Sequence, residues 1–262
     1  MKNFCLVMGV SIIGNKLMSK ICGLVRGVTM KLDVFIFGET IDLCIPTKEF
    51  AEISGWYSWL NDPRMSRYLY RGLFPNTAKD QVEFFQSQED KRLTLIISDK
   101  RDYLGVVSLS HIDLVSKKAS VAMLINPKID FSSSFVNSSI MALEAIARIT
   151  EYGFKAMGIN RIWGGQHVDL SGWGQRMELL GYRVEGILID EFVKGWEVAN
   201  VIWVAATNNN YLSIVKMRGE YWDSAKKMNE RILNLPKVKF SHRVNKFLDE
   251  EGSSYYDKIL EL

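Results

Sequence analysis

Apolar and polar residues follow two different periods along this chain, and the change of period separates predicted strands from predicted helices. Short runs rich in β-branched and aromatic residues, bounded by turn-forming residues, predict strands. These runs are residues 34–37, 41–45, 93–98, 103–112, 119–126, 161–168, 182–190 and 198–206. Apolar positions three and four residues apart predict helices after the capping residues Thr47 and Thr77, and over 138–157 and 171–180. The alternation indicates a mixed α/β chain.

The segment 138–157 has the clearest helical pattern. Its polar residues Glu144, Arg148, Glu151 and Lys155 form a single stripe with favourable pairs four residues apart. The other positions are apolar or small. We therefore expect this helix to pack against a sheet over most of its circumference.

Residues 1–29 differ in composition from the rest, because they contain basic residues but no acidic one. Their apolar run Phe4–Gly14 is shorter than the ~20 residues that a membrane span needs. No alanine precedes Ala51, so an A-x-A cleavage site is absent. Three interpretations stay open: an amphipathic surface helix, a weak export signal, or translation upstream of a true start at Met30. We expect residues 1–29 to be an extension outside the fold and residues 30–206 to form the main domain.

A C-terminal helical extension is predicted over residues 207–262. It follows the boundary at Asn208–Asn210, has a helical pattern over 211–235, and is broken by Pro236. Its apolar residues recur at helical spacing, which is typical of a docking face on the same chain or on a second copy. A homodimer through this extension is therefore one expected assembly.

The composition and net charge of the chain argue against several classes of function. The 33 Lys+Arg residues nearly balance the 30 Asp+Glu residues, so the net charge of +3 gives no support to a nucleic-acid partner. The three cysteines form no CxxC pair and the three histidines are far apart, which argues against a metal site and against a disulfide framework. A cytoplasmic location and no stable membrane insertion are expected.

Four segments in sequence order resemble one family. They are WLNDPRMSRYL (59–69), LGVVSLSHIDLVSKKASVAMLINP (104–127), ALEAIARITEYGFKAMGINRIWGG (142–165) and ELLGYRVEGILID (178–190). They resemble motifs of the GNAT N-acetyltransferase superfamily, in the branch that includes ribosomal-protein N-terminal acetyltransferases, over about residues 30–206. The resemblance implies an α/β (α+β) fold with a mixed central sheet of about six to seven strands and flanking helices.

The resemblance also implies a co-substrate, acetyl-CoA, and transfer to an amine without a covalent intermediate. In this family a splayed strand holds the pantetheine arm, which here corresponds to Met123, Leu124 and Ile125. The pyrophosphate is held at the N-terminus of the following helix. The residues that correspond to this loop are Asn137, Ser138, Ser139, Ile140 and Ala142.

Two departures from the family pattern stand out. The phosphate loop lacks its usual basic residue or Gln and its first Gly. In the helix before Gly181, Leu170 and Met177 replace an Asn and a Tyr that protonates the thiolate, so a tyrosine acid is not expected there. Trp173 with its neighbouring glycines predicts a differently shaped wall beside the pantetheine.

Candidate acceptor-side residues come from three regions. His111 is the candidate general base, since an imidazole titrates near ~6.5; the alternative is a hydrogen-bonded structural histidine. His167 and Asp190 are candidate substrate contacts near the cleft and the last hairpin. Tyr68, Tyr70 and Arg71 lie between the first two helices, where they either grip a sugar or nucleotide ring or pack the loop onto the sheet.

The sequence thus predicts an acetyl-CoA-dependent N-acetyltransferase, and no metal cofactor. The C-terminal extension favours a small-molecule primary amine, such as an amino sugar nucleotide, as acceptor. One alternative is a ribosomal-protein or peptide N-terminal acetyltransferase. A second alternative, allowed by the degenerate phosphate loop, is a non-catalytic binding protein on the same fold.

Overall fold

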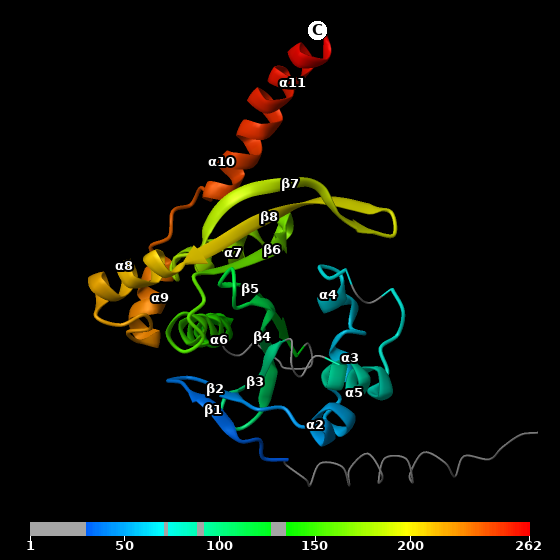
Figure 1. Ribbon diagram of the computed structural model, residues 1–262, viewed down its shortest axis with the longest axis vertical. Coiled ribbons are helices and arrows are strands. Elements are labelled where there is room, and N and C mark those ends of the chain that lie inside the picture. The colour runs from blue at the N-terminus through cyan, green and yellow to red at the C-terminus, as the bar shows by residue number, and fades with distance from the viewer. Residues whose placement is uncertain (1–29, 71–72, 88–91, 127–134) are drawn as a thin grey trace, which may run out of the picture. The chain divides into compact units, whose positions relative to one another are not determined.

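A single twisted sheet of eight strands organises the chain (Figure 1). The computed structural model describes residues 30–70, 73–87, 92–126 and 135–262, and residues 33–262 form one compact unit. The strands are β1 (Val34–Phe37), β2 (Asp42–Cys44), β3 (Leu93–Ser98), β4 (Tyr103–Asp113), β5 (Lys118–Ile125), β6 (Arg161–His167), β7 (Arg183–Lys194) and β8 (Glu197–Thr207). All eight predicted runs form strands of this sheet, which is slightly more than the six to seven strands that the family resemblance implies. The interpretations of residues 1–29 lie outside the described residues.

The strand order β1-β2-β3-β4-β5-β6-β8-β7 contains one parallel pair, β5 with β6. That pairing is short: it joins Lys118 to Arg161, Ala119 to Ile162 and Ser120 to Trp163, and then ends. β5 continues to Ile125 and β6 to His167 without further pairing between them. The two strands therefore diverge in the middle of the sheet.

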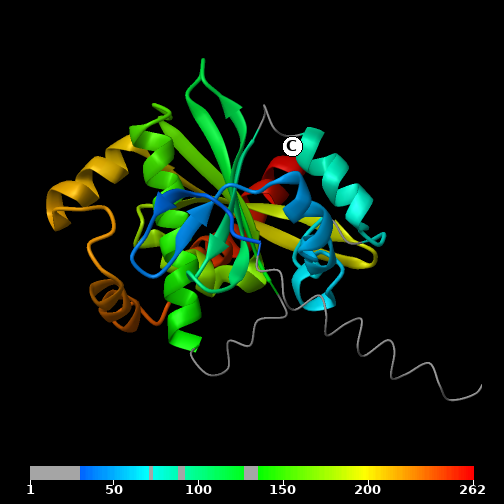
Figure 2. The ribbon, with the colours of Figure 1, turned by 90° about the horizontal axis from the view of Figure 1, so that it is seen from below.

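Helices cover both faces of the sheet. The early helices are α2 (Lys48–Ile53), α3 (Trp56–Trp59), α4 (Pro63–Ser66) and α5 (Ala78–Ser87); the long helix is α6 (Phe135–Lys155), and after β6 come η2 (Val168–Leu170) and α7 (Ser171–Glu178). Figure 2 shows α2–α5 on one side of the sheet and α6 on the other. The apolar side of α6 is buried against the strands, with Leu143, Ile146 and Ile149 almost without exposed surface. The predicted packing of this helix is confirmed.

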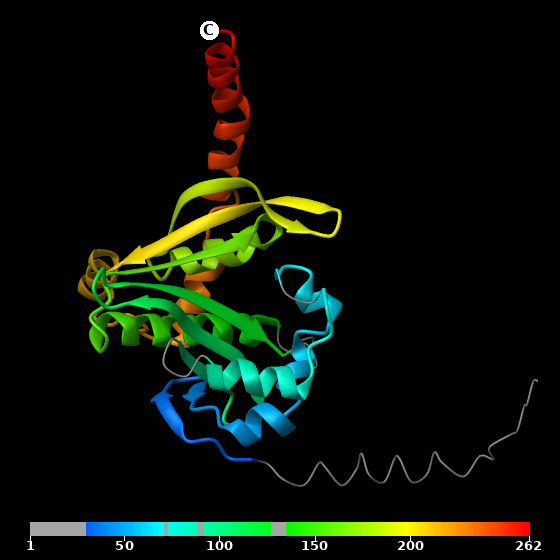
Figure 3. The same ribbon diagram turned by 45° about the vertical axis from the view of Figure 1, so that its right-hand side comes forward.

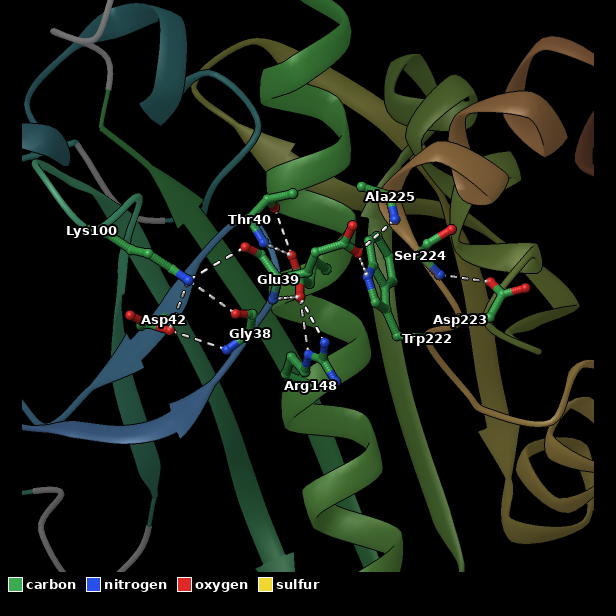
Figure 4. Close-up of polar contacts among 11 residues, drawn as sticks. Gly38, Glu39, Thr40, Asp42, Lys100, Arg148, Trp222, Asp223, Ser224 and Ala225 are labelled. Carbon is green, nitrogen blue, oxygen red and sulfur yellow. Dashed lines mark hydrogen bonds and ion pairs between the residues drawn. The ribbon is translucent and has the colours of Figure 1, made fainter.

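One member of the predicted polar stripe on α6 is not on the surface. Glu144 is fully buried, and its carboxylate accepts hydrogen bonds from the backbone N–H of Glu39 at 2.6 Å and of Thr40 at 2.8 Å. The Thr40 hydroxyl and the guanidinium of Arg148 also donate to it, at 2.6 Å and 2.9 Å. This single carboxylate holds the β1–β2 turn against α6, and Figure 4 shows two of its partners, Thr40 and Arg148. A buried carboxylate is tolerated when donors such as these replace the hydrogen bonds that it would make with water.

The C-terminal extension begins with two helices, not one. α8 (Asn208–Arg218) ends at Gly219, whose φ of 87° suits only a glycine, and α9 (Ala225–Leu233) follows. Between them Trp222 donates its indole N–H to the Glu39 carboxylate at 3.0 Å (Figure 4). Since Tyr221 and Met228 are also buried, this half of the extension docks on its own chain.

The remaining helices α10 (Phe240–Phe247), η3 (Leu248–Gly252) and α11 (Ser253–Leu260) form one helical segment that extends away from the sheet (Figure 3). The side chains of Phe247, Tyr255 and Leu260 on it are exposed. A homodimer through this segment stays a prediction. No helix in the described parts of the chain is long and apolar enough to cross a membrane.

Candidate active site

The divergence of β5 and β6 opens a hollow of about 440 Å³, which we call the β5–β6 hollow. Its walls come from both strands, from α6, from α7 and from the segment after α4. They include Met65, Tyr68, Leu69, Val121, Met123, Ile125, Met141, Ala142, Gly164, Gln166, His167, Leu170, Trp173, Arg176 and Met177. The hollow passes between the two strands, because α6 and the α4 segment lie on opposite faces of the sheet.

The backbone of β5 presents unpaired groups to this hollow. The N–H of Asn126 bonds to the carbonyl of Leu104, which makes this pair hydrogen-bonded in the antiparallel ladder with β4. Bonded and non-bonded pairs alternate, so the N–H and C=O of Met123 and Ile125 point away from β4 and toward the gap. The strand that the family resemblance assigns to the pantetheine arm is therefore the strand beside the gap. Leu124 lies between these positions and turns its side chain to the opposite face, away from the β5–β6 hollow.

Four side chains around the β5–β6 hollow carry buried polar atoms without a hydrogen-bond partner. These atoms are Ser139 Oγ, both Gln166 amide atoms, His167 Nε2 and Arg176 Nε. Buried polar atoms are normally paired, because an unpaired one loses its hydration and gains nothing in return. Their convergence on one hollow fits a ligand with several hydrogen-bonding groups along its length.

Gln166 and Gly174 form a matched pair in the wall of the hollow. A Cβ at position 174 would lie 2.0 Å from Gln166 Nε2 and 3.0 Å from its Cδ, so only glycine leaves room for this amide. The neighbouring residues Leu170 and Met177 also line the hollow and contribute apolar side chains to its wall. Gln166 was not a candidate in the sequence, because a glutamine near the end of a strand carries no spacing signal of its own.

The predicted phosphate-binding turn is described in part. Asn137 and Ser138 lie in the first turn of α6, and Ser139 and Ala142 line the hollow. Ile140 is 5% exposed and packs into the core, so its side chain does not obstruct this end of the helix. The free N–H groups of a helix N-terminus favour an anion.

The predicted substrate contact Arg71 lies outside the described residues.

A second hollow, also of about 440 Å³, lies on the face that carries α2–α5. It shares Leu69, Ala122 and Met123 with the β5–β6 hollow. Its other walls include Trp56, Leu60, Tyr70, Gln81, Phe84, Arg92, Thr94, Val106, Ser108, His111 and Leu124. The two hollows therefore meet beside Met123, which is the arrangement needed for two substrates to approach one point.

His111 lies in the wall of the second hollow because of a bulge in β4. The β4–β5 register shifts between Ser110 and Asp113, and His111 has a φ of 49°, which is rare for a residue other than glycine. Bulges re-aim side chains and are frequent beside active sites. Its Nδ1 lies 3.3 Å from Ser110 Oγ, and its ring centroid lies 5.8 Å from that of Trp163.

Asp190 has the same backbone feature in β7. Its φ is 52°, the β7–β8 register shifts around it, and its N–H donates to Asn200 Oδ1 at 3.0 Å. Its side chain is exposed and lies outside both hollows. The structure therefore does not bring Asp190 together with His111.

His167 is buried among aromatic rings at the end of β6. Its ring centroid lies 5.1 Å from that of Tyr68 and 4.9 Å from that of Phe192. Its Nδ1 accepts a hydrogen bond from the Asp169 N–H at 3.2 Å, which in the neutral ring leaves the proton on Nε2, 3.5 Å from Glu197 Oε1. His167 lines the β5–β6 hollow, but with Nδ1 accepting this hydrogen bond its neutral ring has no free acceptor with which to act as a base.

Lys194 fixes the segment that carries Tyr68 and Tyr70. Its ammonium, on the β7–β8 hairpin, donates to the carbonyls of Ser66 and Leu69, the latter at 3.1 Å. Tyr70 in turn donates weakly to the Glu191 carbonyl at 3.4 Å, and burial followed by the Glu191 charge raises the pKa of its hydroxyl. Sequence reasoning missed Lys194, since nothing local connects it to a helix more than a hundred residues away.

No group of three or more metal-ligating side chains occurs within the described ranges. The thiol of Cys44 is buried, and burial together with the charges of Asp42 and Asp33 raises its pKa to about 11. A thiol in this state is a poor nucleophile. Neither metal-assisted nor Cys44-based chemistry therefore has support among these residues.

Comparison with known proteins agrees with this geometry. Residues 45–183, more than half of the chain, match the family model of the acetyltransferase (GNAT) domain. No curated protein sequence matches the chain significantly. A solved spermidine N-acetyltransferase from Vibrio cholerae, in complex with CoA and spermine, has a TM-score of 0.57 and 16% identity over 67% of this chain and 99% of its own.

The Microcin C7 self immunity acetyltransferase MccE, solved with acetyl-CoA and AMP, has a TM-score of 0.52 and 20% identity over 65% of this chain and 93% of its own. At these identities the two structures show a shared fold. The family match and the fold confirm the predicted superfamily: this chain belongs to the GNAT acetyltransferase family and is an acetyltransferase.

Proposed function

We propose that this protein is an acetyl-CoA-dependent N-acetyltransferase that acts on a primary amine of a small molecule. One observation carries the proposal: the β5–β6 hollow, which passes between the strands, meets the second hollow beside Met123, where β5 has left its partner strand. A thioester from one side and an amine from the other can then come within bonding distance, while the protein excludes bulk water.

The β5–β6 hollow is the proposed site of acetyl-CoA. The N–H groups of Met123 and Ile125 are free to bind the pantetheine arm and the acetyl oxygen. Gln166 and Arg176 would add side-chain donors, and the N-terminal end of α6, which includes Asn137, Ser138 and Ser139, would bind the pyrophosphate through its free N–H groups. Bound acetyl-CoA supplies an acetyl group on a reactive thioester. Two structural neighbours were solved in complex with CoA and acetyl-CoA, which supports the assignment.

The second hollow is the proposed acceptor site, with His111 as general base. An alkyl ammonium must lose a proton before its nitrogen can attack. His111 would take that proton, the nitrogen would bond to the acetyl carbon, and the carbon–sulfur bond would break to release CoA, whose thiolate takes a proton from solvent. Tyr70 lines the second hollow and would contact the substrate there, whereas Tyr68 and His167 line the β5–β6 hollow and Asp190 lies outside both. An amino sugar nucleotide is one acceptor of the proposed class.

Release of the CoA thiol from acetyl-CoA, measured over a panel of amines, tests the proposal. We expect His111→Ala to lower kcat/KM by roughly 10²-fold and to remove the acidic limb of the pH–rate profile, with acetyl-CoA affinity unchanged. His242→Ala is a matched control, because His242 lies on α10, outside both hollows. A His111→Ala enzyme with a near-normal rate and the same acidic limb would return His111 to a structural role.

A further inference from the structure

The C-terminal helical segment α10–η3–α11 carries an apolar stripe that the described part of the chain leaves open to solvent (Figure 3). Phe240, Phe247, Tyr255 and Ile259 are 51%, 55%, 59% and 45% exposed. Every residue in 249–262 is exposed apart from one glycine. Isolated helices shorter than ~12–15 residues are marginal in water, and most helices are stabilised by packing of their apolar face. The segment therefore needs a partner that buries this stripe.

The π-helical turn η3 keeps the apolar stripe continuous. Phe247 and Tyr255 are eight residues apart, which in a regular α-helix would rotate one side chain by roughly 80° from the other. A π-turn takes one more residue, so the turn Leu248–Gly252 brings Tyr255 back into line with Phe247. Phe240 lies seven residues before Phe247, and Ile259 lies four after Tyr255. All four side chains thus lie on one face along the whole segment.

Charge divides the same segment into two halves of opposite sign. Residues 237–247 contain four Lys or Arg and no Asp or Glu, whereas residues 248–262 contain five Asp or Glu and one Lys. Two copies of this helix side by side in the same direction would place like charges together. In opposite directions, each basic half would meet an acidic half. The segment is complementary to itself in the antiparallel arrangement.

We propose that Phe240–Leu260 is a dimerisation helix, which pairs antiparallel with the same segment of a second copy of this chain. Such a pair has a two-fold axis, so the contact is closed and gives a dimer instead of a filament. A helix rises about 1.5 Å per residue, so each copy contributes roughly 30 Å of helix. The Phe and Tyr rings of the two stripes are the anchors of the interface.

The apolar surface continues onto β7 beside α10. Ile189 on this strand is 55% exposed. The next residue, Asp190, donates its N–H to Asn200 Oδ1, and the Asn200 amide donates to Asn245 Oδ1 on α10 at 3.1 Å. Ile189 therefore lies close to the base of the helix. In an antiparallel pair the far end of the second copy's helix reaches this base, where it covers further apolar surface.

A membrane surface fits the segment less well than a second copy does. Helices that lie on membranes carry Lys and Arg along their polar face, and these residues are attracted to anionic headgroups. Here only residues 237–247 have that character. The acidic half, residues 248–262, would be repelled by the same headgroups.

Charge reversal tests the antiparallel pairing in the full-length protein. The acidic variant reverses three basic residues, Lys239→Glu, Arg243→Glu and Lys246→Glu. The basic variant reverses three acidic residues, Glu250→Lys, Asp257→Lys and Glu261→Lys. None of the six side chains is buried, and all six lie outside the β5–β6 hollow. Analytical ultracentrifugation over a range of concentrations measures the dimer Kd.

We expect the wild-type protein to be a dimer at micromolar concentration. Each variant alone should have a dimer Kd at least about 30-fold higher, because six charge pairs in the symmetric dimer change from attraction to repulsion. An equimolar mixture of the acidic and the basic variant should form a heterodimer. A variant with all six reversals exchanges the two charged halves and should dimerise again.

A matched control makes the same change of charge elsewhere on the surface. The triple variant Lys48→Glu, Lys216→Glu and Lys226→Glu alters three exposed lysines on α2, α8 and α9, and should keep the wild-type dimer Kd. Circular dichroism checks that each variant keeps its helices. Recovery of the dimer in the mixture and in the six-fold variant separates a loss of pairing from a loss of folding.

Three results would overturn the proposal. The first is a wild-type protein that stays monomeric at ~100 micromolar, far above the Kd that a specific dimer needs. The second is an acidic variant that dimerises like the wild type, or a mixture that forms no heterodimer, since another face would then make the contact. The third is a monomeric wild-type protein that sediments with vesicles of phosphatidylcholine and phosphatidylserine, which would assign the segment to a membrane surface.

Discussion

Replacement of Gly174 by alanine is expected to weaken acetyl-CoA binding by moving a neighbouring side chain. The new Cβ would lie 2.0 Å from Gln166 Nε2, well inside contact distance. Because that atom is the end of a flexible side chain, Gln166 can rotate away at small cost to folding. The amide would then leave the wall of the β5–β6 hollow, where both of its polar atoms are now buried without a partner.

The magnitude follows from the hydrogen bonds that this amide can make. If its donor and its acceptor each bond to the pantetheine arm, two neutral hydrogen bonds are lost, at about 1 kcal/mol each. A total of about 2 kcal/mol corresponds to a rise in Kd of roughly 30-fold. The free energy of unfolding should change little or rise, since alanine favours a helix over glycine by up to about 1 kcal/mol.

Calorimetric titration with acetyl-CoA measures the effect. Gly172→Ala is a matched control on the same helix, because its Cβ would meet only Lys239 Cε, at 3.9 Å. Gln166→Met, which keeps the length of the side chain and removes its polar atoms, should reproduce the weakening. Gly174→Ala should add nothing in the Gln166→Met background. Unchanged affinity in folded Gly174→Ala or Gln166→Met protein would refute the reasoning.

Three further predictions concern the phosphate end of the site and the stability of the fold. Ser139→Asp should weaken CoA binding sharply through like charge beside the pyrophosphate, whereas Ser139→Ala should cost about 1 kcal/mol; equal calorimetric affinities for the two variants would place the ligand elsewhere. Glu144→Gln should lower the free energy of unfolding in denaturant by about 3 kcal/mol, because Arg148 loses a buried partner, and Glu151→Gln on the same helix by less than about 1 kcal/mol. The Arg231 guanidinium lowers the pKa of Asp223 to about 2 from 3.8, so this carboxylate stabilises the fold above pH ~4 and its contribution is lost as the pH falls toward 2. Denaturant titrations should thus find Asp223→Asn less stable by about 2 kcal/mol at pH 7 and equal to wild type near pH 2; a difference that is the same at both pH values would show that the ion pair is not its cause.

The features that the sequence predicted are those with a local period. The apolar face of α6 and the alternation in β4 and β5 recur within a few residues, so they identify the long helix and the central hairpin without tertiary information. Met123 and Ile125 were named from the family resemblance, and the register of β5 with β4 is what turns their N–H groups toward the gap.

The features that escaped prediction depend on partners distant in sequence. Glu144 belongs to a regular polar stripe, and its burial is decided by the β1–β2 turn more than a hundred residues earlier. Gly219 ends α8, although the helical pattern continues through it, and beyond it Tyr221 donates to the Leu180 carbonyl and Trp222 to the Glu39 carboxylate. Gln166 becomes notable only opposite Gly174, and the positive φ of His111 is fixed by a bulge that alternation does not encode.

A crystal structure with acetyl-CoA tests the central claim most directly. We expect the pantetheine arm to lie between β5 and β6, within hydrogen-bond distance of the Met123 N–H and the Gln166 amide. The pyrophosphate should lie at the N-terminal end of α6. This claim would be contradicted by a ligand bound outside this gap, or by the absence of binding at millimolar acetyl-CoA, which would favour a non-catalytic role for the same fold.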